Sequence, residues 1–156
     1  MDSHYITVNS TKLHYVTGGK EDGPVCLLLH GFPQSWITWR NVIPYLEAHY
    51  KIIAVDLRGY GDSDKPESIE NYTNKIMAQD ITEILAAQNV TTAYVVGHDR
   101  GARVARRLAY DHPELINRLA LIEIMPMEYV YSLSAEEAAK SIGTGYFRLC
   151  LIYRRL

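Results

Sequence analysis

Residues 95–104 of this chain read Val-Val-Gly-His-Asp-Arg-Gly-Ala-Arg-Val. The apolar run before Gly97 predicts a buried strand, and the apolar spacing after Gly101 predicts a helix. The two glycines allow a sharp turn between the strand and the helix. A reactive residue held between two glycines in such a turn is the pattern of a nucleophile elbow. The sequence therefore predicts that Asp99 is presented at the end of a strand as a nucleophile.

The carboxylate of Asp99 restricts the chemistry that this turn can perform. Attack of a carboxylate on a carbonyl gives an anhydride, whereas attack on an sp3 carbon with a leaving group gives an ordinary ester. Water activated by a histidine can then hydrolyse that ester. Asp99 therefore indicates carbon–halogen displacement or epoxide opening. The alternative is that Asp99 only caps the N-terminus of the helix that follows.

The length and charge of the chain restrict the class of protein. With 156 residues it has room for one domain and a sizeable core. Its 16 Lys and Arg against 18 Asp and Glu give no electrostatic basis for binding nucleic acid or a membrane surface. The two cysteines, Cys26 and Cys150, form no disulfide framework and indicate reduced thiols. Since there is no signal-peptide pattern and no apolar run of membrane-spanning length, we expect a cytoplasmic protein.

The order of the predicted elements indicates a doubly wound α/β fold. Asn9 and Ser10 separate two alternating runs and predict a β-hairpin at the start of the chain. After the hairpin, apolar strands alternate with helices, which is typical of a mostly parallel sheet. The predicted strands are residues 5–8, 12–16, 25–29, 52–55, 93–96 and 116–125. The predicted helices are a broken segment around Pro44, residues 73–88, and a segment from residue 102 to about residue 112.

The turn at residues 30–33, His-Gly-Phe-Pro, is predicted to lie beside Asp99, because ligands bind such a sheet at the carboxyl ends of its strands. An elbow hydrolase forms its oxyanion hole from the N–H after the nucleophile and an N–H in the loop after the third strand. These are the backbone N–H groups of Arg100 and Phe32, which would hold an oxyanion on the Asp99 carboxyl. The alternative for residues 30–33 is a plain tight turn.

A metal centre at the same edge of the sheet would need ligands from His30, His98 and Asp99. The spacing of these residues matches no known metal-ligand pattern. The sequence therefore predicts no metal and no other cofactor.

Arg100 and Arg103 lie in the first turn of the predicted helix, where the positive end of the helix dipole disfavours cations. Beside Asp99, their guanidinium groups would keep the carboxylate ionised and would bind an anionic substrate through forked hydrogen bonds. The alternative is that one or both face solvent or pair with structural carboxylates, as we expect for Arg106 and Arg107.

Three motifs together resemble those of α/β-hydrolase fold enzymes: residues 30–33 (HGFP), 56–64 (DLRGYGDSD) and 97–103 (GHDRGAR). Within that fold, the chain is most similar to the fluoroacetate (haloacetate) dehalogenases. Their epoxide hydrolase relatives usually carry tryptophan after the aspartate. The resemblance implies that Arg100 and Arg103 grip the carboxylate of the substrate. It also implies that Glu123, although aspartate is usual there, is the acid of the catalytic triad.

The resemblance also implies how the chain is divided. Enzymes of this kind are considerably longer, so residues 1–126 are expected to be the N-terminal part of the hydrolase core and residues 127–156 the start of a cap. The sheet would be truncated after the sixth strand, leaving an unpaired edge, and the catalytic histidine would be missing. The resemblance implies an aromatic-His-Trp segment in the cap. Codons for Tyr-Trp-His-Trp, read one base late, encode the Ile-Gly-Thr-Gly found at residues 142–145. Residues 142–156 are therefore expected to be translated out of frame.

The sequence thus favours a hydrolase that cleaves the carbon–halogen bond of a small haloacid through an aspartyl ester. In its truncated form, this chain is expected to be inactive or limited to a single turnover. One alternative is an epoxide hydrolase of the same fold. Another is a truncated product without catalysis. The expected partner is a small anionic substrate, with no nucleic acid and no membrane. The exact substrate and the oligomeric state are not predicted.

Overall fold

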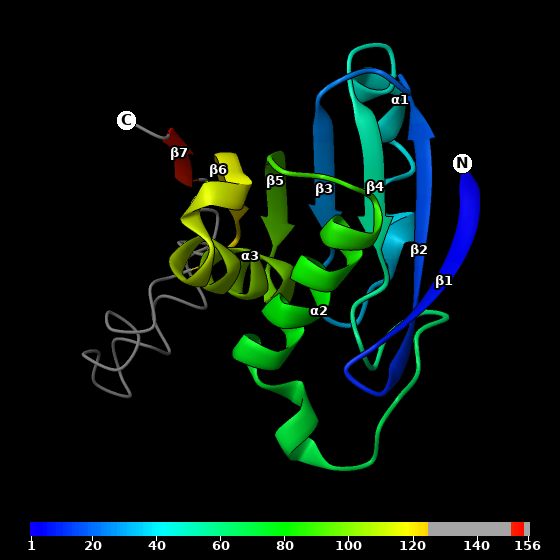
Figure 1. Cartoon of the computed structure of the whole chain (residues 1–156), viewed down its shortest axis with the longest axis vertical. Helices are drawn as coiled ribbons and strands as arrows, with labels where there is room; N and C mark the ends of the chain where they lie inside the picture. The colour runs from blue at the N-terminus through cyan, green and yellow to red at the C-terminus, as the bar shows by residue number, and fades with distance from the viewer. Residues whose placement is uncertain (125–150, 155–156) are drawn as a thin grey trace, which may run out of the picture.

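The computed structural model describes residues 1–124 and the backbone of residues 151–154. A single sheet of seven strands runs through the molecule in the order β1-β2-β4-β3-β5-β6-β7 (Figure 1). The strands are β1 (Asp2–Val8), β2 (Thr11–Gly19), β3 (Val25–Leu29), β4 (Lys51–Val55), β5 (Ala93–His98), β6 (Ile116–Ile122) and β7 (Leu151–Arg154). The helices are α1 (Ile43–Leu46), α2 (Asn74–Ala87) and α3 (Arg100–Asp111), with 3₁₀ turns η1 (Trp36–Trp39), η2 (Ile69–Tyr72) and η3 (Pro113–Leu115).

The directions of strands β3, β4 and β5 determine where a ligand-binding crevice lies in this sheet. Strand β3 pairs in parallel with both β4 and β5, and β5 pairs in parallel with β6. The chain runs from β3 to β4 on one side and later returns to β5 on the other, so β3 marks the point where the strand order reverses. The carboxyl ends of β3 and β5 therefore meet at the crevice where doubly wound sheets bind ligands.

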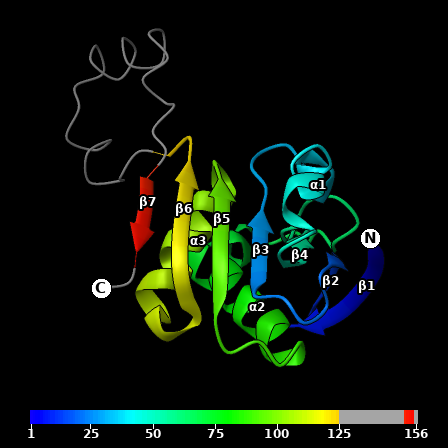
Figure 2. The same cartoon turned by 90° about the horizontal axis from the view of Figure 1, so that it is seen from above.

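Helices cover both faces of the sheet, and this explains why the central strands are apolar throughout. Along β3, Leu27 and Leu29 face one core while Cys26 and Leu28 face the other, as the two-residue period of a strand requires. The first core packs against α2 and α3, and the second packs against η1 and α1 (Figure 2). The predicted doubly wound, mostly parallel sheet is confirmed.

The six predicted strands are all present, with small differences at their ends. The predicted strand at residues 116–125 ends earlier, at Ile122, because Glu123 adopts a positive φ of 54° that breaks the extended backbone. The broken helix expected around Pro44 is confirmed as η1 followed by the one-turn helix α1. The predicted helix at residues 73–88 is α2, and the hydroxyl of Thr73 caps it by accepting the N–H of Ile76 at 3.2 Å.

The edge beyond β6 differs from the expectation of an unpaired strand. Strand β7 pairs antiparallel with β6, with Leu151 opposite Leu121 and Arg154 opposite Arg118. The expectation of an unpaired edge at β6 is therefore wrong. Strand β7 was not predicted because a strand of four residues gives no periodic signal in the sequence. Apart from β7, the expected cap at 127–156 and out-of-frame tail at 142–156 lie outside the described residues.

No helix among the described residues is long and apolar enough to cross a membrane. The cytoplasmic location stays a prediction.

The thiol of Cys26 gives a test of the core beneath α1. Its side chain is 4% exposed, and burial raises its pKa to about 11. In the folded chain at about pH 8, Cys26 should therefore react with iodoacetamide far more slowly than in urea, since little thiolate forms and access is blocked. Peptide mapping quantifies Cys26 separately from Cys150. Equal rates in the folded and unfolded chain would contradict the buried position.

Candidate active site

Asp99 occupies a strained turn between β5 and α3. Its φ of 48° and ψ of −110° lie outside the regions that ordinary side chains prefer, a conformation that costs about 1–3 kcal/mol. The flanking glycines are required by close backbone approach. A Cβ on Gly97 would lie 2.6 Å from Cα of Ala102, and one on Gly101 would lie 2.5 Å from the carbonyl oxygen of His30. The predicted strand, tight turn and helix are confirmed.

The side chain of Asp99 does not cap α3, within the residues that the structure describes. Its main-chain oxygen instead accepts the N–H groups of Ala102 at 3.1 Å and Arg103 at 3.2 Å. The carboxylate Oδ1 accepts the backbone N–H of Phe32 at 2.9 Å. The capping alternative therefore does not describe this aspartate, whose carboxylate lies against one of the two predicted oxyanion donors.

The turn at residues 30–33 is held by a buried, neutral histidine. His30 is 0% exposed; its Nδ1 donates to the carbonyl of Gly31 at 2.9 Å, and its Nε2 accepts the N–H of Leu57 at 3.0 Å. Burial lowers the pKa of His30 below its usual value, which favours this neutral ring. Gly31 is required because a Cβ there would lie 2.7 Å from Cβ of Asp99. The turn thus positions the Phe32 N–H, and His30 has both nitrogens engaged, which leaves it no role as a metal ligand.

A pocket of about 370 Å³ opens beside Asp99. It lies where the loop after β3 meets the first residues of α2 and α3. Three of the side chains expected at the site, Asp99, Arg100 and Arg103, are brought together there. The lining residues are Phe32, Tyr72, Thr73, Asn74, Asp99, Arg100 and Arg103.

Tyr60 is a part of this site that the sequence analysis missed. The guanidinium of Arg100 donates to the Tyr60 hydroxyl at 3.0 Å and lies 6.0 Å from the centre of its ring. The ring packs edge-on against His30 at 5.3 Å and against Phe32 at 6.4 Å. Burial raises the pKa of Tyr60, although Arg100 acts in the opposite direction, so the hydroxyl stays neutral as an acceptor. Tyr60 lies in the glycine-rich motif at residues 56–64, but nothing in the motif indicated which of its side chains would reach Arg100.

Glu123 lies beside the elbow but contacts a histidine that was not predicted as its partner. Its Oε2 lies 2.6 Å from Nε2 of His98, and Nδ1 of His98 lies 3.1 Å from Oε1 of Gln34. Main-chain bonding holds the two segments together, because the N–H of Asp99 donates to the carbonyl of Ile122 at 2.9 Å. His98 is therefore held by Glu123 and Gln34.

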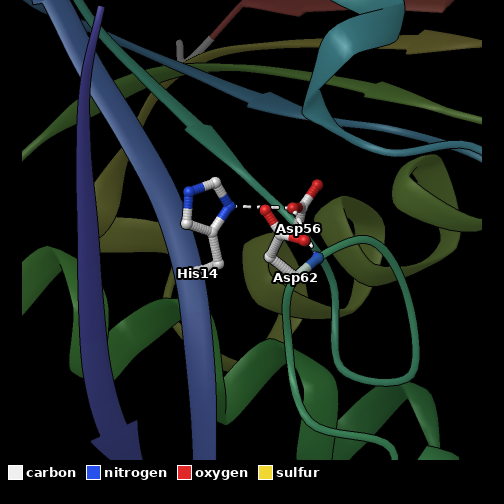
Figure 3. A group of neighbouring side chains, drawn as sticks. All are labelled: His14, Asp56 and Asp62. Atoms are coloured by element: carbon white, nitrogen blue, oxygen red, sulfur yellow. Dashed lines mark hydrogen bonds and ion pairs between the residues drawn. The ribbon is translucent and has the colours of Figure 1, made fainter.

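A second polar group, on the β2 side of the sheet, is formed by His14, Asp56 and Asp62 (Figure 3). Asp56 is 1% exposed; its Oδ1 accepts the N–H of Trp36 at 2.7 Å, and its Oδ2 accepts Nδ1 of His14 at 2.8 Å and the N–H of Asp62 at 3.1 Å. Among the described residues, these three alone bring together as many as three potential metal-ligand atoms. Since the Asp56 carboxylate is already committed to three donors, the group is explained by hydrogen bonding without a metal.

Comparisons with known proteins agree with the observed fold. Residues 24–145 match the family model described as "alpha/beta hydrolase fold". The chain is 42% identical over 123 residues to the soluble epoxide hydrolase of Corynebacterium sp. (strain C12), covering 79% of this chain and 42% of that protein. It is 37% identical over 145 residues to the fluoroacetate dehalogenase of Burkholderia sp, covering 91% and 46%. The solved structure of ALR0039 from Nostoc sp PCC 7120 superposes with a TM-score of 0.84 at 39% identity, covering 94% of this chain and 50% of that one. The chain thus spans about half the length of the proteins it matches.

The close approach at Gly101 predicts a large effect from one methyl group. In Gly101→Ala the new Cβ would meet the carbonyl oxygens of Leu29 and His30, which are backbone atoms with little freedom to move. We expect the free energy of unfolding, measured with urea, to fall by about 1–3 kcal/mol. The matched control is Gly18→Ala, where the new Cβ meets the flexible side chain of Met1 and the expected change is small. Equal losses in the two variants would contradict the tight packing of the elbow.

Proposed function

The chain belongs to the alpha/beta hydrolase fold family, and from this membership we propose that it cleaves the carbon–halogen bond of a small haloacid through an ester on Asp99. The observation that carries the proposal is the position of Asp99. Its carboxylate lies at the point of the elbow where the nucleophile is expected, and its Oδ1 accepts the backbone N–H of Phe32 at 2.9 Å. A hydrolase that passed through an acyl intermediate would need a hydroxyl or thiol at this position.

The proposed first step is a displacement. A carboxylate oxygen of Asp99 attacks the carbon that bears the halogen, and the halide leaves with the bonding electron pair. In the second step water adds to the carboxyl carbon of the ester, and the backbone N–H groups of Phe32 and Arg100 stabilise the oxyanion that forms there. The bond from the carboxyl carbon to the substrate oxygen then breaks. One proton of the water goes to the hydroxyl of the glycolate-type product, the other is released to solvent, and the Asp99 carboxylate is regenerated.

The charge of the pocket supports an anionic substrate. Arg100 and Arg103 both line it together with Asp99, and a small haloacid carries one carboxylate that two guanidinium groups can bind. Tyr60 would hold the Arg100 guanidinium on the pocket side through its hydroxyl. The fluoroacetate dehalogenase of Burkholderia sp, a relative at 37% identity, is named for a substrate of this class.

We keep Glu123 as the acid partner of a histidine in the second step. The histidine that Glu123 contacts here is His98, whose two nitrogens are engaged by Glu123 and Gln34. Neither nitrogen is thereby available to take a proton from water, so this chain by itself is proposed to form the ester and to hydrolyse it slowly or not at all.

An epoxide hydrolase is the second candidate, supported by the Corynebacterium relative at 42% identity. The same aspartate would open an epoxide ring to an ester. The two candidates differ in substrate charge, since an epoxide offers no carboxylate for Arg100 and Arg103.

The Arg103→Leu variant distinguishes the two candidates. Removing one forked, charge-assisted contact should weaken haloacetate binding by about 1.5–3 kcal/mol, while reaction with a neutral haloalkane changes little. Binding and the rate of ester formation would be measured for both substrates. Arg40→Leu is the matched control because Arg40 is exposed and outside the pocket. Equal losses on both substrates would mean that Arg103 is structural and would favour the epoxide candidate.

The ester itself is the direct test of the proposed function. After long incubation of this chain with bromoacetate, the intact mass should increase by one carboxymethyl group on Asp99, with no catalytic release of bromide. Peptide sequencing separates this ester from alkylated thiols, and Asp99→Asn is the matched control because it keeps the shape and removes the nucleophile. Absence of the Asp99 adduct would favour the alternative that this chain is a truncated protein without catalytic activity. Sustained bromide release would show that a base within this chain completes the second step.

A further inference from the structure

Ser3, His14 and Asp56 form a hydrogen-bonded relay at the β1 edge of the sheet. Oγ of Ser3 lies 2.8 Å from Nε2 of His14, and Nδ1 of the same ring lies 2.8 Å from Oδ2 of Asp56. Hydroxyl, imidazole and carboxylate thus follow one another in the order by which a base activates a serine. Ser3 lies on β1, His14 lies on β2 and Asp56 directly follows β4. The hydroxyl and the imidazole are therefore separated from the Asp99 strand β5 by β4 and β3 (Figure 1).

The partners of Asp56 determine which atom of His14 carries the proton. Asp56 also accepts the N–H groups of Trp36 and Asp62, so it is an acceptor toward every partner, as an ionised carboxylate is (Figure 3). The proton between Asp56 and His14 therefore belongs to Nδ1. In the neutral ring Nε2 is then a lone-pair acceptor, and the hydroxyl of Ser3 must donate to it. This is the proton arrangement that general-base activation of a hydroxyl requires.

Burial preorganises the base and leaves the nucleophile accessible. His14 and Asp56 are 3% and 1% exposed, whereas Ser3 is exposed. The N–H of His14 is held by Oγ of Ser63 at 2.9 Å, which fixes the backbone beneath the ring. The ring also lies 5.0 Å from that of Tyr5, so its orientation is held on the β1 side as well.

The strand register supplies a donor beside the hydroxyl. Asn9 and Ser10 form a two-residue turn with positive φ at both positions, which makes Val8 and Thr11 a hydrogen-bonded pair. Since such pairs alternate along an antiparallel ladder, Ser3 and Val16 are a non-hydrogen-bonded pair. The N–H of Ser3 therefore points away from β2 to the open side of β1, where it can donate to an oxyanion formed next to Oγ.

We infer that Ser3 is a second nucleophile of this protein, activated by His14 and Asp56, which accepts acyl groups from small carboxylic esters that reach the β1 edge. Oγ of Ser3 bonds to the carbonyl carbon while Nε2 of His14 takes its proton. The bond to the leaving oxygen then breaks, and His14 returns the proton to it, releasing an alcohol. Water, deprotonated by His14, hydrolyses the acyl-serine to the acid and restores the hydroxyl. The step needs only the ester and water.

An alkyl fluorophosphonate tests the site because it labels activated serines without subsequent turnover. Oγ of Ser3 displaces fluoride at phosphorus, and its proton passes to His14. We expect one phosphonyl group per chain, mapped to Ser3 by peptide sequencing and absent in Ser3→Ala. The His14→Gln variant should label more slowly by a factor on the order of 10². Ser68 is the internal control, since it is an exposed serine whose side chain makes no capping hydrogen bond.

Labelling of Ser3 no faster than Ser68, or an unchanged rate in His14→Gln, would overturn the inference. Because His14→Gln disturbs a buried hydrogen bond to Asp56, a second comparison avoids the question of whether the variant folds. Ser3→Cys and Ser68→Cys both place a thiol on the surface, and only the first lies beside His14. Alkylation by iodoacetamide should be at least about tenfold faster at position 3, since a neighbouring base raises the thiolate fraction. Equal rates would show that His14 does not activate this position.

Discussion

The close approach of two backbone segments at the elbow is the constraint on which the site depends. Gly101, in the first turn of α3, lies against the carbonyl groups of Leu29 and His30 at the end of β3, with no side chain between them. The same approach brings Gly31 against Asp99 and the Phe32 N–H to 2.9 Å from its carboxylate. The proposed nucleophile and the proposed oxyanion donor are thus positioned by one backbone contact, so a shift of either segment moves both. Such preorganisation spares the reaction the cost of arranging its donors.

Buried polar pairs hold the loops that surround this contact. His30 ties the loop after β3 to Leu57 in the loop after β4, and Arg58 ties that second loop to α2 through two hydrogen bonds to Asp80, at 2.8 and 2.6 Å. Asn9 adds a bond to Asp80 at 2.9 Å from the first hairpin. Removing either Arg58 or Asp80 would leave the other charge buried without its partner, at a cost of about 3–5 kcal/mol. The loops are therefore held by interactions that tolerate little change, which suits a site whose geometry must persist.

Local patterns predicted the fold and the centre of the site, and distant contacts could not be predicted. Apolar periodicity located six strands and two main helices, and the glycine spacing located Asp99, because each of these signals lies within a few consecutive residues. The bonds of Tyr60 to Arg100 and of His98 to Glu123 join residues 40 and 25 positions apart. No spacing rule connects such pairs, since their contact exists only after the sheet has formed. Strand β7 was missed for a related reason, because it is defined by its partner β6 more than by its own four residues.

The histidines show why a residue type alone does not give a function. A general base must present a nitrogen lone pair to the oxygen that loses the proton. The lone pair on Nε2 of His30 accepts the N–H of Leu57. Both nitrogens of His98 are hydrogen-bonded to side-chain oxygens, those of Gln34 and Glu123. His14 alone of these three has a carboxylate on one nitrogen and a hydroxyl on the other. A hydrolase of this kind needs a nucleophile and a histidine that acts as a base. In the described part of the chain these two lie apart: no histidine with a carboxylate on one nitrogen and a hydroxyl on the other contacts Asp99. His14, which has that arrangement, lies on β2, three strands away from β5 and beside Ser3.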